Sequence, residues 1–356
     1  MTTIKPNPVL YVNEELQFFV DHREQDEPTL GDGEIFIETQ FSGVNPADML
    51  HSTLGGIYPT ILGFDFCGTV RKAAPDALDQ PGDVVAGMTP SGLGRPTKYG
   101  THQQYLVALE SMVFPVPPNL PAPHAACLAV VTLAGADALY NLFHFPLPDE
   151  PLDQQPPRPL LIWGASSGVG LTALQLARAS GIHPILVTAS PSRHDLLRSL
   201  GATHCFDYQS PTVVADIKAA TADAPLQYGF DTVGADIQGV NTAQLTADCV
   251  PAEALLASVL FQSDPRFLFP LSTPNVETSF QLKGMAHPVT LPPRVADWDR
   301  VRRAVRWAVE NYGNGFRLPK VTVHEGTAAE ALREIRLVGE YGRGFGKVAL
   351  KHSLRV

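Results

Sequence analysis

The chain has 356 residues, a length that suits about two domains rather than one ordinary core. Because 44% of the residues are apolar and only 17% are charged, the chain can bury sizeable cores, which excludes wholesale disorder. Its 26 basic and 36 acidic residues give a net charge of −10, which argues against nucleic acid or an anionic membrane as the main partner.

The N-terminal 20 residues contain one lysine and no apolar run long enough for a signal peptide. No segment reaches the roughly 20 uninterrupted apolar residues that a membrane-spanning helix needs. The cysteines, at positions 67, 127, 205 and 249, form no C-x-x-C pair, so they suit a reducing cytosol and support neither a zinc lobe nor a disulfide framework. We expect a soluble, cytoplasmic protein.

The part of the chain up to about residue 125 is predicted to be rich in short β-strands between turn signals. The strand candidates are residues 33–41, 69–70, 83–86 and 105–108. Residues 125–142 are mostly small and apolar, which is typical of a buried helix. The proline-rich stretch 145–159 can form neither a helix interior nor a central strand, so it indicates an exposed connection.

After this connection strands and helices alternate, which predicts a parallel sheet covered by helices. Strands are expected at 160–163, 184–188, 204–208, 228–233, 254–260 and, as a sixth, 277–282, with helices at 171–179, 192–200 and 212–220. Residues 297–312 have the pattern of an amphipathic helix. The strand-like segment 346–351 is predicted to rejoin the first domain's sheet, so that residues 1–125 and 292–356 form one discontinuous domain around a nucleotide domain at 126–291.

The strongest local signal is the segment 160–171, in which a strand is followed by a glycine turn and the start of a helix. This arrangement directs backbone N–H groups and the positive end of a helix at a pyrophosphate. Gly168 and Gly170 match the last two glycines of the dinucleotide fingerprint, whereas Ala165 and Ser167 depart from it. The βαβ succession that follows favours a dinucleotide site over a helix-initiating turn without a ligand.

The tip of the second strand of this domain indicates which dinucleotide binds. An NAD site needs a carboxylate about 20 residues after the glycines, to bond the ribose 2′-hydroxyl. This tip instead offers Ser190, Ser192 and Arg193, a setting that a 2′-phosphate prefers and that favours NADPH. The alternative is that a serine caps a helix and Arg193 faces water, and Asp195 would weaken the NADPH prediction if it turned toward the ribose.

Other chemical signatures are sparse. The sequence has no G-x-S-x-G nucleophile motif, no H-E-x-x-H and no Cys/His cluster. Asp65 lies between apolar residues, and we expect a structural carboxylate bonded to backbone amides. Cys67 and Cys127 are expected to be small buried apolar residues.

Several motifs together resemble those of zinc-independent medium-chain dehydrogenases/reductases of the quinone oxidoreductase type, over essentially the whole chain. They are Val44-Asn-Pro-Ala-Asp48, Gly63-Phe-Asp-Phe-Cys-Gly-Thr-Val70, Gly82-Asp-Val-Val85, Gly100 before Tyr105, the turn 165–170 and Gly346-Lys-Val348. The resemblance implies an α/β fold, with a Rossmann-type doubly wound parallel sheet inserted in a β-rich GroES-like catalytic domain. Zinc-binding relatives carry Gly-His-Glu where this chain has Gly63-Phe64-Asp65, so no catalytic metal is expected.

Within this family the chain is most similar to the fungal trans-acting enoyl reductases that serve polyketide synthases. The stretches 145–159, 187–194 and 200–208 carry this narrower match. The resemblance implies NADPH-dependent reduction of an α,β-unsaturated thioester on the acyl carrier domain of a polyketide synthase or synthase–peptide synthetase hybrid.

The resemblance also assigns site residues. It places Ser166, Ser167, Gly168 and Val169 at the pyrophosphate, Ser190, Ser192 and Arg193 at the 2′-phosphate, and Tyr208 near the adenosine. It places Asn45, Asp48, Leu255, Leu256, Phe345 and Gly346 beside the nicotinamide. Thr132, Leu133 and Gly135 would line the acyl pocket, with Phe280, Gly284 and Met285 on its far side.

One departure concerns the first loop, because relatives often carry a lysine where this chain has Leu50 after Met49. His51 is adjacent and is a candidate substitute, although an exposed loop histidine is the simpler expectation. Charge develops on the thioester oxygen during hydride transfer, and either Thr132 or a backbone N–H is the predicted donor to it. The proton donor to the α-carbon is His51, Tyr58 or water.

Two other functions stay open. One is a free-standing NADPH quinone or enone reductase with no carrier partner. The other, motivated by the missing lysine, is a redox-neutral protein that binds or cyclises a metabolite on the same fold. The sequence leaves the acyl substrate, the product stereochemistry and the choice between monomer and dimer open.

Overall fold

A computed structural model describes the chain in seven segments. These are residues 7–24, 27–150, 158–234, 236–237, 240–273, 275–341 and 344–356. The chain divides into two compact units: unit 1 comprises Met1–Val130, Thr273–Arg294 and Pro319–Val356, and unit 2 comprises Val131–Ser272 and Val295–Leu318.

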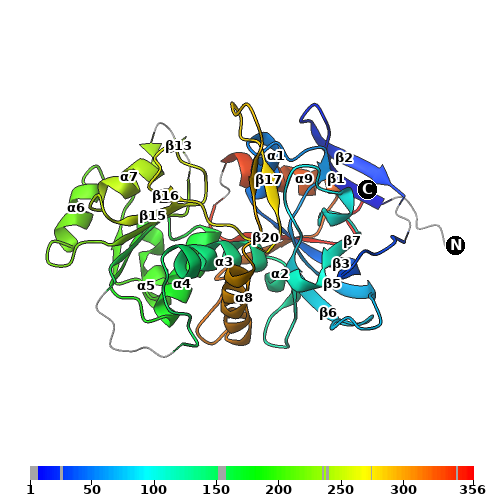
Figure 1. Ribbon diagram of the computed structural model, residues 1–356, viewed down its shortest axis with the longest axis horizontal. Helices are drawn as coiled ribbons and strands as arrows, with labels where there is room; N and C mark the ends of the chain where they lie inside the picture. Colours follow the sequence, from blue (N-terminus) through cyan, green and yellow to red (C-terminus); the bar gives the residue numbers. More distant parts are fainter. Residues whose placement is uncertain are drawn as a thin grey trace. The chain divides into compact units, whose positions relative to one another are not determined.

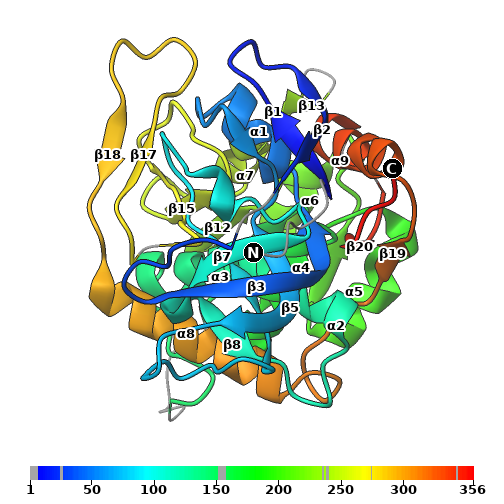
Figure 2. The same cartoon turned by 90° about the vertical axis from the view of Figure 1, so that its right-hand side faces the viewer.

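Two sheets build most of unit 1. The larger has the strand order β19-β20-β3-β5-β6-β8, with β7 also paired to β3, and the smaller has the order β2-β1-β4. Figure 2 shows β3 and β5 lying side by side. The strands are β1 (Asn7–Val12), β2 (Phe18–Arg23), β3 (Glu34–Val44), β4 (Thr60–Ile61), β5 (Asp65–Lys72), β6 (Val84–Met88), β7 (Tyr105–Leu109), β8 (Val113–Pro115), β19 (Val321–His324) and β20 (Lys347–Lys351). The helices of this unit are α1 (Ala47–Thr53), η1 (Thr97–Tyr99), η2 (Glu110–Met112), α2 (Ala122–Ala125) and α9 (Ala328–Tyr341).

Strand β3 is the centre of the larger sheet, because it pairs with β5, β7 and β20 along its 11 residues. Apolar side chains of β3, such as Ile35 and Ile37, are buried with Phe66 and Val70 of β5. Strand β20 pairs antiparallel to β3, with Val348 opposite Val44. The prediction that a C-terminal strand rejoins the first sheet is therefore confirmed.

Unit 2 contains a parallel sheet with the order β11-β10-β9-β12-β15-β16. Figure 1 shows α4 and α5 on one side of it and α6 and α7 on the other, so the predicted doubly wound α/β class is confirmed. The strands are β9 (Leu160–Trp163), β10 (Ile185–Thr188), β11 (His204–Phe206), β12 (Tyr228–Asp231), β15 (Leu255–Ser258) and β16 (Phe267–Leu268), with a separate pair β13 (Asp236–Ile237) and β14 (Val240–Asn241). The helices are α3 (Ala129–Ala136), which begins at the end of unit 1, η3 (Asp137–Leu142), α4 (Gly168–Ala179), η4 (Pro191–Arg193), α5 (His194–Leu200), α6 (Val213–Ala220), α7 (Thr242–Asp248) and α8 (Val295–Glu310).

The prediction of a sixth parallel strand at 277–282 is wrong. These residues form β17 (Thr278–Phe280), which pairs antiparallel with β18 (Val289–Leu291) in unit 1, while β16 supplies the sixth strand. The backbone of β17 is held by unit 1 itself, since Leu93 N–H donates to the Ser279 carbonyl. A local strand pattern cannot show which sheet the strand joins.

The unit boundaries differ from the predicted break at residues 291/292. Helix α8 belongs to unit 2, because Asn141 donates a hydrogen bond to the Asp297 carbonyl and Arg300 donates to the Phe145 carbonyl. The β17–β18 hairpin belongs to unit 1. Of the predicted proline-rich connector, residues 151–157 lie outside the described residues.

The helix predicted at 125–142 is broken into α2, α3 and the π-helical segment η3. Asp137 begins η3, and its buried carboxylate accepts hydrogen bonds from Asn141 Nδ2 and from Leu271 N–H, each at 2.7 Å. A π-helical turn inside a helix changes the face on which the following side chains lie. The two hydrogen bonds of the Asp137 carboxylate anchor the chain at the point where the α-helix is broken.

Gly43 of β3 gives a stability prediction for unit 1. A Cβ at this position would lie 2.1 Å from the Ala126 carbonyl oxygen, and backbone atoms there cannot move aside cheaply. We expect Gly43→Ala to lower the free energy of unfolding by about 2–4 kcal/mol, measured by urea denaturation. Gly31→Ala is the control, because its Cβ meets only the flexible Glu34 side chain at 3.4 Å, and equal losses in the two variants would contradict the packing argument.

Candidate functional site

The turn between β9 and α4 in unit 2 is built from residues that permit tight packing. Gly164 has φ +78°, in the left-handed region that glycine tolerates. A Cβ on Gly170 would lie 2.7 Å from both Ala165 Cα and the Gly164 carbonyl oxygen, so only glycine lets the first turn of α4 approach the strand end. The glycines of the predicted fingerprint therefore have a local steric reason.

This turn leaves backbone donors available to a ligand. The Ser167 side chain caps α4 by accepting from Gly170 N–H at 2.9 Å. Within the described chain, the N–H groups of Ser166, Gly168 and Val169 have no acceptor, and these residues are only half-buried. Three such donors at the positive end of a 12-residue helix suit an anion with several oxygens, such as a pyrophosphate.

Thr232, which the sequence did not predict, holds this turn in place, and the neighbouring Asp231, also not predicted, anchors the loop after β12. Thr232 Oγ1 donates to the Trp163 carbonyl at 2.8 Å and accepts from Ser167 Oγ at 3.0 Å. The buried Asp231 carboxylate accepts from the N–H groups of Val233 and Gly234 and from Thr242, and burial raises its pKa. Their position at the carboxyl end of β12, the strand next to β9, is the signal that could have identified them.

The tip of β10 carries the predicted 2′-phosphate residues on the short helix η4. Ser190 and Arg193 are half-buried and Ser192 is exposed, and Arg193 N–H donates to the Ser190 carbonyl at 2.9 Å. Asp195 is fully exposed and forms an ion pair with Arg198 at 2.9 Å. This pairing removes the particular doubt that Asp195 raised about the nucleotide assignment.

The other residues predicted near the coenzyme differ in exposure. Tyr208 and Leu255 are 43% and 41% exposed, so their side chains are accessible. Leu256 is fully buried in the core of unit 2 with Leu161 and Trp163, so its predicted contact with the nicotinamide would have to come from its backbone. Alternation along β15 puts neighbouring side chains on opposite faces, which explains the difference.

In unit 1, Asn45 is the hub of a buried polar cluster. Its Nδ2 donates to Asp65 Oδ2 at 2.9 Å, and its Oδ1 accepts from Lys347 Nζ at 2.5 Å. Lys347 also donates to the Val44 carbonyl, and Asp65 Oδ1 accepts from Val130 N–H, each at 2.8 Å. Lys347 lies in the motif Gly346-Lys-Val348, but the sequence predicts no role for it.

Burial raises the pKa of Asp65 to about 6, although the nearby Lys347 ammonium opposes this rise. The expected structural carboxylate is thus present, held by one backbone amide and one side-chain amide. Cys67 and Cys127 are fully buried, as predicted.

Helix α1 carries Asp48 and His51. Asp48 is 1% exposed, and its Oδ2 accepts from Asn45 N–H at 2.8 Å. The simpler expectation of an exposed loop histidine is wrong for His51. Its Nδ1 lies 2.9 Å from Ser91 Oγ, and its ring packs edge-on against Phe64. Burial lowers the pKa of His51 to about 4, so the imidazole is neutral at physiological pH.

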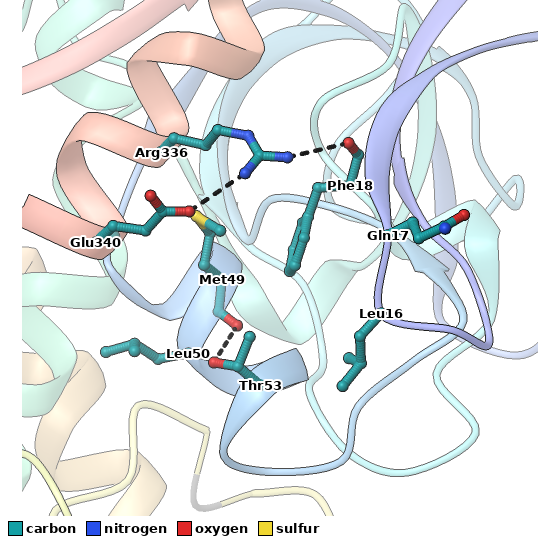
Figure 3. Close-up of a pocket in the computed structure, with 9 residues that line it drawn as sticks. Leu16, Gln17, Phe18, Met49, Leu50, Thr53, Arg336 and Glu340 are labelled. Atoms are coloured by element: carbon teal, nitrogen blue, oxygen red, sulfur yellow. Dashed lines mark hydrogen bonds and ion pairs between the residues drawn. The ribbon is translucent and has the colours of Figure 1, made fainter.

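A pocket of about 710 Å³ lies beside α1 (Figure 3). Leu16, Phe18, Met49 and Leu50 give it apolar walls, and Arg336 bridges Glu340 and the Phe18 carbonyl, each at 3.3 Å. The pocket lining includes none of the residues predicted to contact the acyl chain.

The residues predicted for the acyl pocket are placed as follows. In unit 2, Thr132 is fully buried and its Oγ1 has no hydrogen-bond partner in the described structure. Leu133 is 3% exposed, while Gly135 faces α4, since its Cβ would meet Thr172 Oγ1 at 3.3 Å; this contact gives Gly135 a helix-packing role instead of the predicted one. In unit 1, Phe280 is buried on β17, and Gly284 and Met285 are exposed at the hairpin turn.

Two further positions predicted near the nicotinamide precede β20. Phe345 and Gly346 are half-buried, and Gly346 has φ +106°. A Cβ on Gly346 would lie 2.9 Å from the Lys320 carbonyl oxygen, so a glycine is required where this segment passes the backbone before β19. Tyr58, a predicted proton-donor candidate, is 36% exposed.

Among the described residues, no group of three or more His, Cys, Asp or Glu side chains is arranged to hold a metal ion. In the same part of the chain, no helix has both the length and the apolar character needed to cross a membrane.

Comparison with protein families gives two matches. Residues 31–118 match the alcohol dehydrogenase GroES-like domain, and residues 168–248 match the zinc-binding dehydrogenase family. The chain therefore contains segments that match both domain families of the medium-chain dehydrogenases/reductases, which confirms the resemblance predicted from its motifs.

Curated relatives of this chain include trans-enoyl reductases. The chain is 35% identical over 205 residues to the trans-enoyl reductase himH of Aspergillus japonicus, covering 56% of this chain and 59% of that protein. It is 31% identical over 217 residues to a trans-enoyl reductase of Gibberella fujikuroi, covering 58% of each chain. The matches thus span less than two thirds of these relatives.

Solved structures share the fold over nearly the whole chain. The CurK enoyl reductase superposes with a TM-score of 0.68 at 17% identity, over 97% of this chain and 99% of that one. A quinone oxidoreductase of Coxiella burnetii superposes with a TM-score of 0.67 at 19% identity, over 98% and 99% of the two chains.

The raised pKa of Asp65 predicts how stability depends on pH. The folded state binds a proton at this site up to about pH 6, whereas the unfolded chain releases it near pH 4, so this group's stabilising contribution is fully present below pH 4 and is lost as pH rises through 6. The unfolding free energy of the wild type minus that of Asp65→Asn should fall by about 2–3 kcal/mol from pH 4 to pH 7. Urea titrations across this range test it, and a difference that stays flat would contradict it.

Proposed function

We propose that this protein is a trans-acting enoyl reductase of the cytoplasm that uses NADPH to reduce an α,β-unsaturated thioester. The substrate would be a polyketide intermediate on the acyl carrier domain of a separate synthase. The names of the fungal relatives support this proposal. The observation that carries it is the combination, within unit 2, of a turn with three N–H donors and a strand tip that carries Ser190, Ser192 and Arg193, where Asp195 pairs with Arg198.

The residues present fit the coenzyme. The N–H groups of Ser166, Gly168 and Val169 would bind its pyrophosphate, and Ser190, Ser192 and Arg193 would bind the 2′-phosphate. When bound, NADPH supplies the hydride for the β-carbon of the substrate.

The protein's own task is then to stabilise the developing enolate and to supply one proton to the α-carbon. The hydroxyl of Thr132 is a suitable donor to the thioester oxygen, because it is buried and lacks a partner. A buried, dry donor of this kind gains more from a developing negative charge than from a neutral oxygen. Asn45 and Asp48 would border the nicotinamide, and their buried hydrogen bonds keep that loop in one conformation.

The alternative of a free-standing quinone or enone reductase is separated from this proposal by one comparison. NADPH oxidation is followed with enoyl groups on an isolated acyl carrier domain, on pantetheine and as small soluble enones. A preference for the carrier-bound thioester supports the trans-acting role, equal rates on small enones favour the free-standing reductase, and no NADPH oxidation with any of them favours the redox-neutral protein.

Arg193→Ala should weaken NADPH binding about 10- to 100-fold and NADH binding less than threefold, because only NADPH carries the 2′-phosphate. Fluorescence titration of both coenzymes measures this. Arg198→Ala is the matched control, since this arginine lies one turn further on and pairs with Asp195. Equal losses for the two coenzymes in Arg193→Ala would contradict the NADPH assignment.

Thr132→Val removes the hydroxyl while keeping the shape of the side chain. We expect kcat on an enoyl thioester to fall about 10- to 100-fold, with the Kd for NADPH unchanged, because the lost bond strengthens only in the transition state. Thr246→Val is the control, as this threonine is equally buried but its hydroxyl bonds the Thr242 carbonyl of its own helix. An unchanged kcat in Thr132→Val would assign the donor role to a backbone N–H.

A further inference from the structure

A chain of four hydrogen-bonded side chains runs through the interior of unit 1. Ser42 Oγ lies 2.8 Å from His102 Nδ1 and 2.8 Å from His352 Nε2. His102 Nε2 lies 3.1 Å from Asp48 Oδ2. Ser42 and His102 are fully buried, and Asp48 is 1% exposed. The four residues come from β3, the segment before β7, the segment after β20 and α1, so the fold itself brings them together.

These contacts allow a single direction of donation from one end to the other. If His352 carries its proton on Nε2, it donates to Ser42, Ser42 donates to His102 Nδ1, and His102 Nε2–H donates to the Asp48 carboxylate. Passing one proton along these side chains reverses every bond and leaves the same three contacts satisfied. A chain that is complete in both polarities can transfer protons without moving any heavy atom far.

The two ends of the chain differ in their surroundings. His352 is half-buried and borders a pocket of about 430 Å³, together with Glu325, Gly326, Lys351, Ser353 and Arg355. At the inner end, Asp48 Oδ1 is buried and has no hydrogen-bond partner in the described structure. These hydrogen-bonded side chains thus connect a surface pocket with a carboxylate whose second oxygen has no partner in the described structure.

The surroundings of these hydrogen-bonded side chains keep the imidazole at the outer end neutral. Burial lowers the pKa of His352 to about 3, and the neighbouring His102 adds to this effect. The ionisable groups that face the inner end are His51, Asp65, Arg95 and Lys347, and those at the outer end are Glu325, Lys351 and Arg355. Because the His352 imidazole is neutral near pH 7, a proton that enters at its ring is passed on rather than stored.

We propose that His352, Ser42, His102 and Asp48 form a proton route that supplies the α-carbon during reduction. This inference rests on the proposed function, in which Asp48 lies beside the nicotinamide. The hydride and its electron pair go from NADPH to the β-carbon, and the carbon–carbon double bond becomes an enolate. A proton then moves from Asp48 to the α-carbon, and solvent restores it to Asp48 through His352, Ser42 and His102. The net reaction consumes one NADPH and one solvent proton.

Ser42→Ala interrupts the route at its middle. We expect kcat to fall about tenfold, within the range for a lost proton-transfer group, with the Kd for NADPH unchanged. Because protonation would then limit the rate, the isotope effect from NADPH deuterated at C4 should decrease and the solvent deuterium effect should increase. Ser52→Ala is the control, since this buried serine on α1 bonds only the Ile57 carbonyl and lies outside the route.

His352→Phe interrupts the same route at its half-buried outer end, where the β3 core is untouched, so it serves if Ser42→Ala fails to fold.

The ¹⁵N signals of the two imidazoles give a readout without turnover. Protons on Nε2 of both rings, or the fully reversed set, support the route, whereas two imidazoles that both donate to Ser42 overturn it. If the wild type reduces the substrate and both variants keep its kcat and its isotope effects, the proton route is overturned while the proposed function stands. No NADPH oxidation by the wild type with any enoyl thioester overturns the proposed function, and with it the role of the route.

Discussion

The burial of charge around Asn45 is the constraint on which the rest of unit 1 depends. An aspartate and a lysine are removed from water here, and each would be costly alone. The side chain of Asn45 satisfies both, because its amide donates to Asp65 and its carbonyl accepts from Lys347. Strands β3, β5 and β20 supply these partners, so the correct pairing of three distant segments is needed before the cluster is satisfied.

Unit 2 uses backbone groups where unit 1 uses side chains. Its glycine turn has unsatisfied N–H donors at half-buried positions, and Thr232 holds the turn in place from the end of the neighbouring strand. A rigid set of donors loses little entropy when an anion binds, which favours tight coenzyme binding. The chemistry of the two units is therefore complementary: one offers preorganised backbone dipoles and the other offers buried titratable groups.

The sequence allowed prediction of the parts of the structure that local pattern determines. The strand–turn–helix at 160–171 was predictable because glycines, a capping serine and apolar periodicity occur within 12 residues. The sheet to which β17 belongs was not predictable, because its short pattern fits either sheet. His102, Ser42 and His352 were missed for a related reason: their contacts join residues 60 and 310 positions apart, and no local spacing reveals such a cluster.

The place of β20 in the larger sheet has a consequence for biosynthesis. This strand lies between β19 and β3, so the edge strand β19 has no place beside the rest of the sheet until residues 347–351 have been translated. Unit 2 is complete once residue 318 has been made, and it can fold first on the ribosome. Until β20 has been made, β3 presents an unpaired edge along part of its length. Nascent chains at this stage are expected to need protection by chaperones.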